Sequence, residues 1–249
     1  MMKISTLGTG NMARNVAGRW AEAGHAVFFG SRDPDKARSV AAEVGYSADG
    51  GSNQEAAEFG QVVLHTVRMP PSAFLERPAA LEGKILIDLN NRDFPRPAPW
   101  QGLHPSLAEA VQEAHPSTRV VKGFNTMAME IFDHEPAQLK ELGVSAFLAG
   151  NDEDAIDVVS ELARQLGLEP VAVGDLGQAW LLEAQADFIR SIMFSGAGAM
   201  ATVSTRILPA APSTRFGGRR QGAYWQRFSY RADLPYRPGH LPPTSIALV

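Results

Sequence analysis

The sequence predicts an α/β fold, a doubly wound parallel sheet followed by a C-terminal helical segment. Short apolar runs alternate with helical patterns along most of the chain, and the alternation stops after Val173, where one long helical pattern begins. Apolar runs of this kind are typical of strands that helices cover on both faces. We expect a sheet domain over residues 1–175, a closing helix within 176–208 and a basic, aromatic, extended tail over 209–249.

The first expected strand, Lys3–Leu7, is joined to a helix over Asn11–Ala23 by the sequence GTGNMA. Glycine permits the sharp turn and a close approach of ligand to backbone, and the following alanine lets the helix pack on the strand. The free amides and the positive dipole end of such a helix favour a pyrophosphate. The pattern indicates a Rossmann-type dinucleotide site, unless the glycines only make a tight turn. Its cofactor-binding residues would be Gly8, Thr9, Gly10, Asn11 and Met12.

The end of the second strand, Ala26–Phe29, indicates which dinucleotide binds. NAD sites usually carry Asp or Glu there for the ribose 2′-hydroxyl, whereas this chain has Gly30-Ser31-Arg32. A 2′-phosphate would contact the hydroxyl of Ser31, the guanidinium of Arg32 and, one turn into the next helix, the ammonium of Lys36. The sequence therefore predicts NADP(H). An ordinary loop capped by Asp33 is the alternative, and both can hold together.

The remaining elements follow from apolar periodicity. Strands are expected over Val62–Thr66, Ile85–Leu89, Arg119–Val121, Ser145–Ala149 and Leu168–Val173, and helices over Lys36–Val44, Gln54–Phe59, Leu107–Ala114 and Asp154–Leu166. We expect Asn151-Asp152-Glu153-Asp154 to cap a helix rather than bind a metal. His25 is expected on a surface loop. The other histidines show no metal-ligand spacing and the chain has no cysteine, so no metal site is predicted.

Three strand ends should converge at the carboxyl edge of the sheet, where parallel sheets bind ligands. Thr66 and Val67 are expected to border the cofactor there. Asn125, after a later strand, could pair with the nicotinamide carboxamide or only satisfy its own turn. His65 would be the first proton donor to consider for a carbonyl or imine acceptor, although a structural role is more common. Asn125 and His65 are thus the candidate catalytic residues.

Together these residues resemble the F420-dependent NADP oxidoreductases, which pass a hydride between NADP(H) and the deazaflavin coenzyme F420. The resemblance covers about residues 1–208 and rests on the first glycine turn, on Gly30-Ser31-Arg32 with Lys36, and on Leu181 to Gly198, which is similar to the family's closing helix. It implies that the serine, arginine and lysine hold the 2′-phosphate. It also implies that F420 packs near Asn125, Thr126, Ser195 and Gly196.

Three positions depart from that family's pattern, all on the deazaflavin side. Asn125 replaces a histidine, Arg68 replaces a proline, and Ser195-Gly196-Ala197-Gly198 replaces an asparagine-containing segment. Other acceptors, such as flavin, ferric ion or imine, therefore stay open, as does a non-catalytic NADP(H) sensor. A cleft filled opposite Asn125 would favour the sensor. An open, apolar-walled cleft beside Ser195 to Gly198 would favour the enzyme.

Composition predicts the localisation of the protein and the partners that it binds. The chain of 249 residues is 45% hydrophobic with a net charge of −4, and shows neither a secretory signal nor an apolar run long enough to span a membrane. We expect a cytoplasmic protein that acts on a small-molecule acceptor and forms a homodimer through its apolar closing helix. Residues 206–249 hold seven arginines and one acid. Such a tail can bind nucleic acid, but we expect none to be bound.

Overall fold

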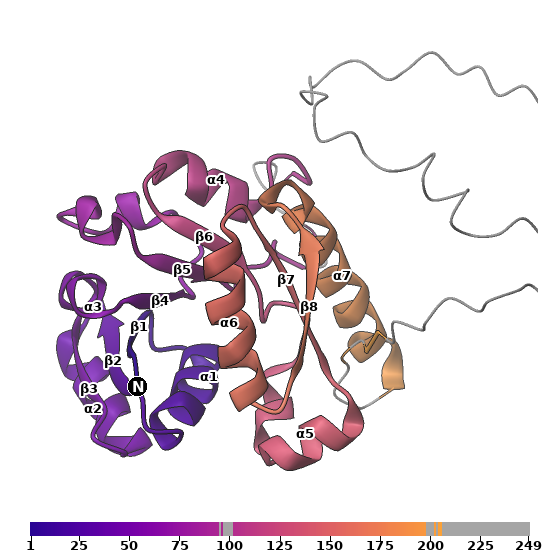
Figure 1. The fold of residues 1–249 in the computed structure, drawn as a ribbon, viewed down its shortest axis with the longest axis horizontal. Helices are drawn as coiled ribbons and strands as arrows, with labels where there is room; N and C mark the ends of the chain where they lie inside the picture. Colours follow the sequence, from indigo (N-terminus) through magenta and orange to yellow (C-terminus); the bar gives the residue numbers. More distant parts are fainter. Residues whose placement is uncertain (95, 97–101, 198–201, 203, 206–249) are drawn as a thin grey trace, which may run out of the picture. The chain divides into compact units, whose positions relative to one another are not determined.

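One sheet runs through the part of the chain that the structure describes, and helices cover both of its faces (Figure 1). The computed structural model describes residues 1–94, 96, 102–197, 202 and 204–205, so the predicted tail over 209–249 lies outside it. The strand order is β3-β2-β1-β4-β5-β6-β7-β8. The strands are β1 (Lys3–Leu7), β2 (Ala26–Ser31), β3 (Asp49–Ser52), β4 (Val62–His65), β5 (Ile85–Asp88), β6 (Arg119–Lys122), β7 (Ser145–Gly150) and β8 (Glu169–Gly174).

The helices divide into two layers. Buried side chains of α1, α2 and α6 form a core on one face, and those of α3, α4 and α7 form a core on the other. None of these described helices is long and apolar enough to cross a membrane. The helices are α1 (Asn11–Glu22), α2 (Pro34–Val44), α3 (Asn53–Phe59), α4 (Leu107–Ala114), α5 (Pro136–Leu142), α6 (Glu153–Gln165) and α7 (Ala179–Ile192). A π-helical turn over Met193–Ala197 extends α7.

The sheet is parallel except where β6 meets β7. There Val121 pairs with Gly150 in antiparallel register, which corrects the all-parallel expectation. A parallel connection needs a crossover, usually a helix that spans the sheet. The segment between β6 and β7 contains only the seven-residue α5 and a 3₁₀ turn, and the chain re-enters the sheet from the edge that it has just left. β8 then pairs with β7 in parallel.

Two local features differ from expectation. Strand β3 was not expected, because its sequence Asp-Gly-Gly-Ser has low strand propensity. Its Gly50 is needed for packing, since a Cβ there would lie 2.4 Å from the carbonyl oxygen of Ala37 in α2. The expectation for His25 was also wrong. Its side chain is buried, its Nδ1 accepts from the amide of Met2 at 3.2 Å and its Nε2 lies 2.8 Å from Oε1 of Gln165.

The acidic run before α6 is a helix cap, as expected. The side chain of Asp152 accepts a hydrogen bond from the amide of Ala155 at 2.7 Å, and Glu153 and Asp154 lie in the first turn. Negative charge at this end of a helix complements its dipole. This acidic cluster therefore has a complete structural explanation.

Candidate functional site

The glycine turn leaves room for a ligand at the start of α1. Gly8 has φ +105°, and a Cβ there would lie 2.5 Å from Oγ1 of Thr66, so the fold itself requires glycine at this position. Gly10 is different. Its φ is −70°, an ordinary value, and a Cβ there would meet nothing within 4 Å. The fold thus makes no demand for glycine at position 10, whereas a ligand that approaches the backbone would.

The N-terminus of α1 is also free of side-chain caps. Gly10 is the N-cap residue, no side chain accepts from the first amides, and the first turn carries no acidic residue. Four other helices, α2, α3, α4 and α6, each use an Asp or Ser side chain there. Uncapped amides and the helix dipole together favour an anion at Gly10, Asn11 and Met12.

The residues predicted for the 2′-phosphate lie together at the end of β2. Ser31 is buried, and its Oγ accepts from the amide of Asp33 at 3.1 Å. Arg32 and Lys36 are exposed, and neither side chain forms an ion pair with a described residue. Asp33 caps α2 through the amides of Asp35 and Lys36, so the capping role and the phosphate site are compatible.

Strand order brings the predicted cofactor residues into one row. Because β2, β1 and β4 are neighbours, the end of β2, the turn after β1 and the end of β4 adjoin one another along the carboxyl edge. Thr66 donates from Oγ1 to the carbonyl of Leu7 at 2.8 Å, and Val67 contacts the position that a Gly8 Cβ would take. Thr66 and Val67 thus border the glycine turn.

The turn after β6 has an unusual backbone. Phe124 has φ +56°, a left-handed conformation that bulky residues rarely adopt, and its ring is fully buried. The ring packs edge-on against Trp20 of α1, with centroids 5.8 Å apart. Backbone strain of this kind persists only where packing enforces it, and it is frequent at functional sites. Here it determines the direction of the two residues that follow, Asn125 and Thr126.

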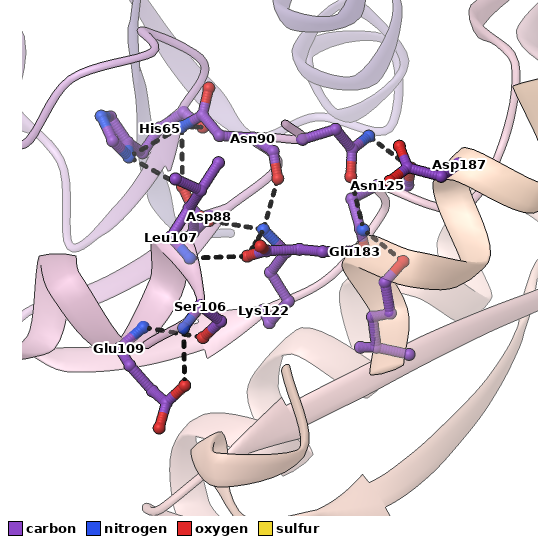
Figure 2. A network of polar contacts seen from close by, with 12 residues as sticks. His65, Asp88, Asn90, Ser106, Leu107, Glu109, Lys122, Asn125, Glu183 and Asp187 are labelled. Carbon is purple, nitrogen blue, oxygen red and sulfur yellow. Dashed lines mark hydrogen bonds and ion pairs between the residues drawn. The ribbon is translucent and has the colours of Figure 1, made fainter. Parts of the chain in front are cut away.

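Asn125 is held in one orientation. Both protons of its Nδ2 are used, in bonds to Oδ1 of Asn91 at 2.8 Å and to the carbonyl of Leu182 at 3.0 Å (Figure 2). A flipped amide would set its oxygen against two acceptors, so the assigned orientation is the favourable one. The Oδ1 atom is buried and has no hydrogen-bond partner among the described residues, and the same is true of Oγ1 of Thr126. Unpartnered buried acceptors cost free energy unless a ligand bonds to them.

A cleft of about 290 Å³ lies beside these residues. Its walls come from the first turn of α1, the turn after β6, and the far end of α7 with its π-helical extension. The apolar side chains that line it are those of Met12, Met127, Ala128, Met129, Ala186, Ile189, Met193 and Phe194. Ser195 is exposed just beyond them and donates to the carbonyl of Ile192 at 2.8 Å. The cleft is open opposite Asn125, and its apolar wall reaches Phe194, next to Ser195, which is the arrangement expected of an enzyme rather than a sensor. Gly198, the last residue of the segment expected beside the cleft, lies outside the described residues.

A buried network of charged groups joins β5, β6 and α7 (Figure 2). Nζ of Lys122, the last residue of β6, donates to Oδ2 of Asp88 at 2.8 Å, to Oε1 of Glu183 at 2.9 Å and to the carbonyl of Asn90. The side chains of Lys122, Asp88 and Glu183 are at most 1% exposed. Burial of unpaired charges is costly, and this mutual pairing is what makes it tolerable.

Protonation within the network follows from burial and pairing. Burial disfavours the charged form of Asp88, yet Lys122 and His65 outweigh it and hold the pKa of Asp88 below its usual range. Burial likewise opposes the charge of Lys122, but Asp88 and Glu183 raise its pKa. For Glu183 burial is the dominant effect, and its pKa is raised although Lys122 opposes this. The network therefore holds Asp88 as a carboxylate and Lys122 as a cation.

His65 has both ring nitrogens engaged. Its Nδ1 lies 2.9 Å from Oδ1 of Asp88, and its Nε2 lies 3.0 Å from the carbonyl of Met69. The ring is buried and lines a small separate cavity of about 170 Å³ under α4, not the cleft beside Asn125. The two candidate catalytic residues thus lie at different cavities, and His65 has the surroundings of a structural histidine.

Sequence reasoning missed Lys122 and Glu183. They are 61 residues apart and meet only through the fold. The sequence feature that could have identified them is a charged residue among apolar residues that are expected to be buried. Lys122 ends the buried strand Arg119–Lys122, and Glu183 lies on the face of α7 that also buries Leu182 and Ala186.

Comparisons with known proteins agree with this geometry. The profile of the family described as "NADP oxidoreductase coenzyme F420-dependent" matches residues 3–92, the part with the glycine turn and the β2 end. The F420-dependent NADP reductase of Methanothermobacter marburgensis is 31% identical over 204 residues, which cover 73% of this chain and 88% of that protein. Metalloreductase STEAP3 of Rattus norvegicus is 28% identical over 187 residues, and this chain spans only 36% of its length.

A solved structure extends the likeness to the fold. A protein of Arthrobacter sp. FB24, provisionally described as an F420-dependent NADP-reductase, superposes with a TM-score of 0.70 at 28% identity. The match covers 84% of this chain and all of that one. The chain is 31% identical to the Methanothermobacter enzyme over 88% of that protein's length, which is enough to assign the family. The chain belongs to the F420-dependent NADP reductase family and is an NADP-dependent oxidoreductase.

Proposed function

We propose that the protein transfers a hydride between NADP(H) and the deazaflavin coenzyme F420, and that F420 binds in the cleft beside Asn125. One observation supports this more than any other. The open, apolar-walled cleft adjoins the row of cofactor residues, and Met12 in the first turn of α1 belongs to both. A flat second carrier in this cleft would lie next to the nicotinamide end of a dinucleotide that binds along the row.

The residues fit NADP(H) at three points. The uncapped amides from Gly10 to Met12 would bind the pyrophosphate, and the open space at Gly10 would admit it. Arg32 and Lys36, with the hydroxyl of Ser31, would bind the 2′-phosphate. A guanidinium offers a planar pair of donors and an ammonium offers a point charge, so the two cations complement each other.

The nicotinamide end would lie along Thr66 and Val67 towards Asn125. Because Nδ2 of Asn125 is already bonded twice, this side chain can only accept, and its free Oδ1 would accept from the carboxamide nitrogen of the ring. That bond would determine which face of the ring is turned to the cleft. Asn125 would then orient the cofactor rather than transfer a proton.

When bound, NADP(H) supplies the hydride chemistry. The protein's task is to hold two flat rings in register and to exclude water from the space between them. The methionines and Phe194 on the cleft wall provide apolar surface for this purpose. Alignment of reacting atoms at about 3–3.5 Å accounts for much of the rate of such reactions. No protein nucleophile is required.

The test is the oxidation of NADPH, followed by its near-ultraviolet absorbance, with four acceptors in parallel: F420, a flavin, a ferric chelate and a cyclic imine. We expect the highest kcat/KM with F420, and lower activity with NADH as donor. Asn125→Leu removes the acceptor oxygen at similar size and should reduce turnover. Preference for another acceptor, or no turnover with any, would contradict the proposal.

A further inference from the structure

The buried network connects α7 to the carboxyl edge of the sheet. Oε1 of Glu183 accepts from Nζ of Lys122 and from the amide of Leu107, each at 2.9 Å (Figure 2). Lys122 belongs to β6 and Leu107 begins α4, so a single carboxylate oxygen joins three elements. Asp88 of β5 bonds to the same Nζ and extends the connection to a fourth.

Consecutive residues of α7 contact both ends of the β6 turn. Glu183 pairs with Lys122 at the start of the turn, and the carbonyl of Leu182 accepts from Asn125 three residues later. The left-handed Phe124 between them limits how the turn can adjust. A displacement of α7 would therefore move Asn125 as well. One further turn along α7, Ala186 and Ile189 line the acceptor cleft.

The gain in stability from the Lys122–Glu183 pair does not by itself explain why charged residues lie between β6 and α7. Buried ion pairs are often no more stabilising than apolar side chains of the same size, because desolvation offsets their attraction. Their bonds are directional, however, whereas apolar contacts tolerate sliding. Glu183 also keeps one oxygen, Oε2, buried without a partner, which is a further cost that stability alone does not explain.

We propose that Lys122 and Glu183 are positioning residues for hydride transfer. Their buried ion pair sets the distance between α7 and the end of β6, and so sets together the orientation of Asn125 and the width of the acceptor cleft. Neither side chain touches the reacting atoms. This inference rests on the proposed function, because it assigns the cleft to the hydride acceptor.

Two substitutions at one position separate the bond from the charge. Glu183→Gln keeps an oxygen that can accept from Lys122 and Leu107, and Glu183→Leu removes both bonds at similar size. Lys122 keeps Asp88 and the Asn90 carbonyl in either variant. The control is Glu109→Leu, which removes a carboxylate that bonds the amide of nearby Ser106 and forms no hydrogen bond or ion pair with a described residue of α7. Glu183→Met also removes both bonds, keeps the unbranched shape of the glutamate side chain and leaves Lys122 paired with Asp88, so it serves if Glu183→Leu does not fold.

Three measurements decide the outcome: steady-state kinetics with the preferred acceptor, NADPH affinity by fluorescence titration, and hydrogen exchange of the amides over residues 179–192. For Glu183→Leu we expect about a tenfold or greater loss of kcat/KM for the acceptor. NADPH affinity should fall by at most about fivefold, because the displaced Asn125 bonds only the nicotinamide end of the cofactor. The α7 amides should exchange at least about tenfold faster. Glu183→Gln should recover most of the kinetic loss, and Glu109→Leu should show neither effect.

Several results would overturn the inference. They are unchanged exchange in α7, unchanged acceptor kinetics despite faster exchange, and a parallel loss of NADPH affinity, which would indicate general destabilisation. Failure of the proposed function is recognised separately, because the unsubstituted protein would then not oxidise NADPH with F420. In that case the exchange data and the NADPH titration of the same variants still decide whether the pair holds α7 in place.

Discussion

At the scale of single residues, two glycines of one motif have different roles. Gly8 is required by its own backbone and by Thr66, whereas Gly10 is required by nothing in the described protein. The motif in the sequence predicted this division, with Gly8 making the turn and Gly10 admitting a pyrophosphate. The positive φ of Gly8 agrees with its part, and the role of Gly10 stays a prediction. The two positions therefore offer a matched pair of substitutions.

We expect Gly8→Ala to destabilise the protein and Gly10→Ala to spare it. A Cβ at Gly8 would clash at 2.5 Å and would hold alanine at φ +105°, which should cost about 1–3 kcal/mol of the free energy of unfolding. Gly10→Ala should leave thermal unfolding unchanged but weaken NADPH binding by tenfold or more, on the order of 1.4 kcal/mol. Normal NADPH affinity in Gly10→Ala would show that the pyrophosphate does not bind there.

Arg32 should discriminate between the two dinucleotides. A charge-assisted hydrogen bond to phosphate contributes about 1.5–3 kcal/mol, so Arg32→Ala should raise the Kd for NADPH by roughly 10- to 100-fold and leave that for NADH nearly unchanged. Calorimetric titration with both cofactors measures this. Arg164→Ala, which removes an exposed arginine from α6, is the matched control. Equal losses for both cofactors would refute the assignment of the 2′-phosphate to Arg32.

At the scale of elements, agreement was good wherever one local pattern determines the structure. Helix α4 lies over Leu107–Ala114 as expected, and α1 ends one residue early. Strand β3 was missed because its glycines reflect the close approach of α2 rather than strand propensity. The Lys122–Glu183 pair was missed for a related reason. A pattern within one element does not show which distant side chain a buried charge will meet.

Helix α7 also bears on the oligomer. Leu181, Phe188 and Ile192 are 42%, 60% and 37% exposed and share one face of this helix. We propose that a second copy of the chain covers this face, as the apolar closing helix led us to expect. Phe188→Glu should then shift a dimer to a monomer in sedimentation velocity. Glu161→Lys on α6 is a control with a charge change elsewhere. A monomeric unsubstituted protein would contradict the expectation.

At the scale of the whole molecule, the charged network makes stability depend on pH. The folded state holds the pKa of Asp88 below its ordinary 3.8, so the unfolded chain binds more protons in acid. The stability that Asp88 contributes is complete above about pH 5 and is lost as the pH falls through the folded-state pKa. Each unit of pKa difference corresponds to about 1.4 kcal/mol.

Asp88→Asn should accordingly lower the free energy of unfolding at pH 7 and reduce its decline between about pH 5 and pH 3. Urea unfolding at several pH values measures both effects. Asp157→Asn, an exposed aspartate of α6, should reproduce neither. An acid decline in Asp88→Asn as steep as in the unsubstituted protein would show that other groups dominate.

The class of the fold was predictable, because buried strands and the glycine turn have recognisable sequence patterns. The direction of β7 was not, because a strand's sequence does not show whether it pairs in parallel or antiparallel.

The reversal of β7 determines from which edge of the sheet the last helix approaches the cleft. Had β7 and β8 run with β6, the chain would leave β8 at the ligand edge and the last helix would lead away from it. Because β7 is reversed, α7 begins near the opposite edge of the sheet and runs towards the carboxyl edge. Ala186 and Ile189 of α7 therefore line the same cleft as Met12 of α1. Under the proposed function, substitutions in the last turn of α7 would alter the acceptor cleft and leave the nucleotide residues at the end of β2 unchanged.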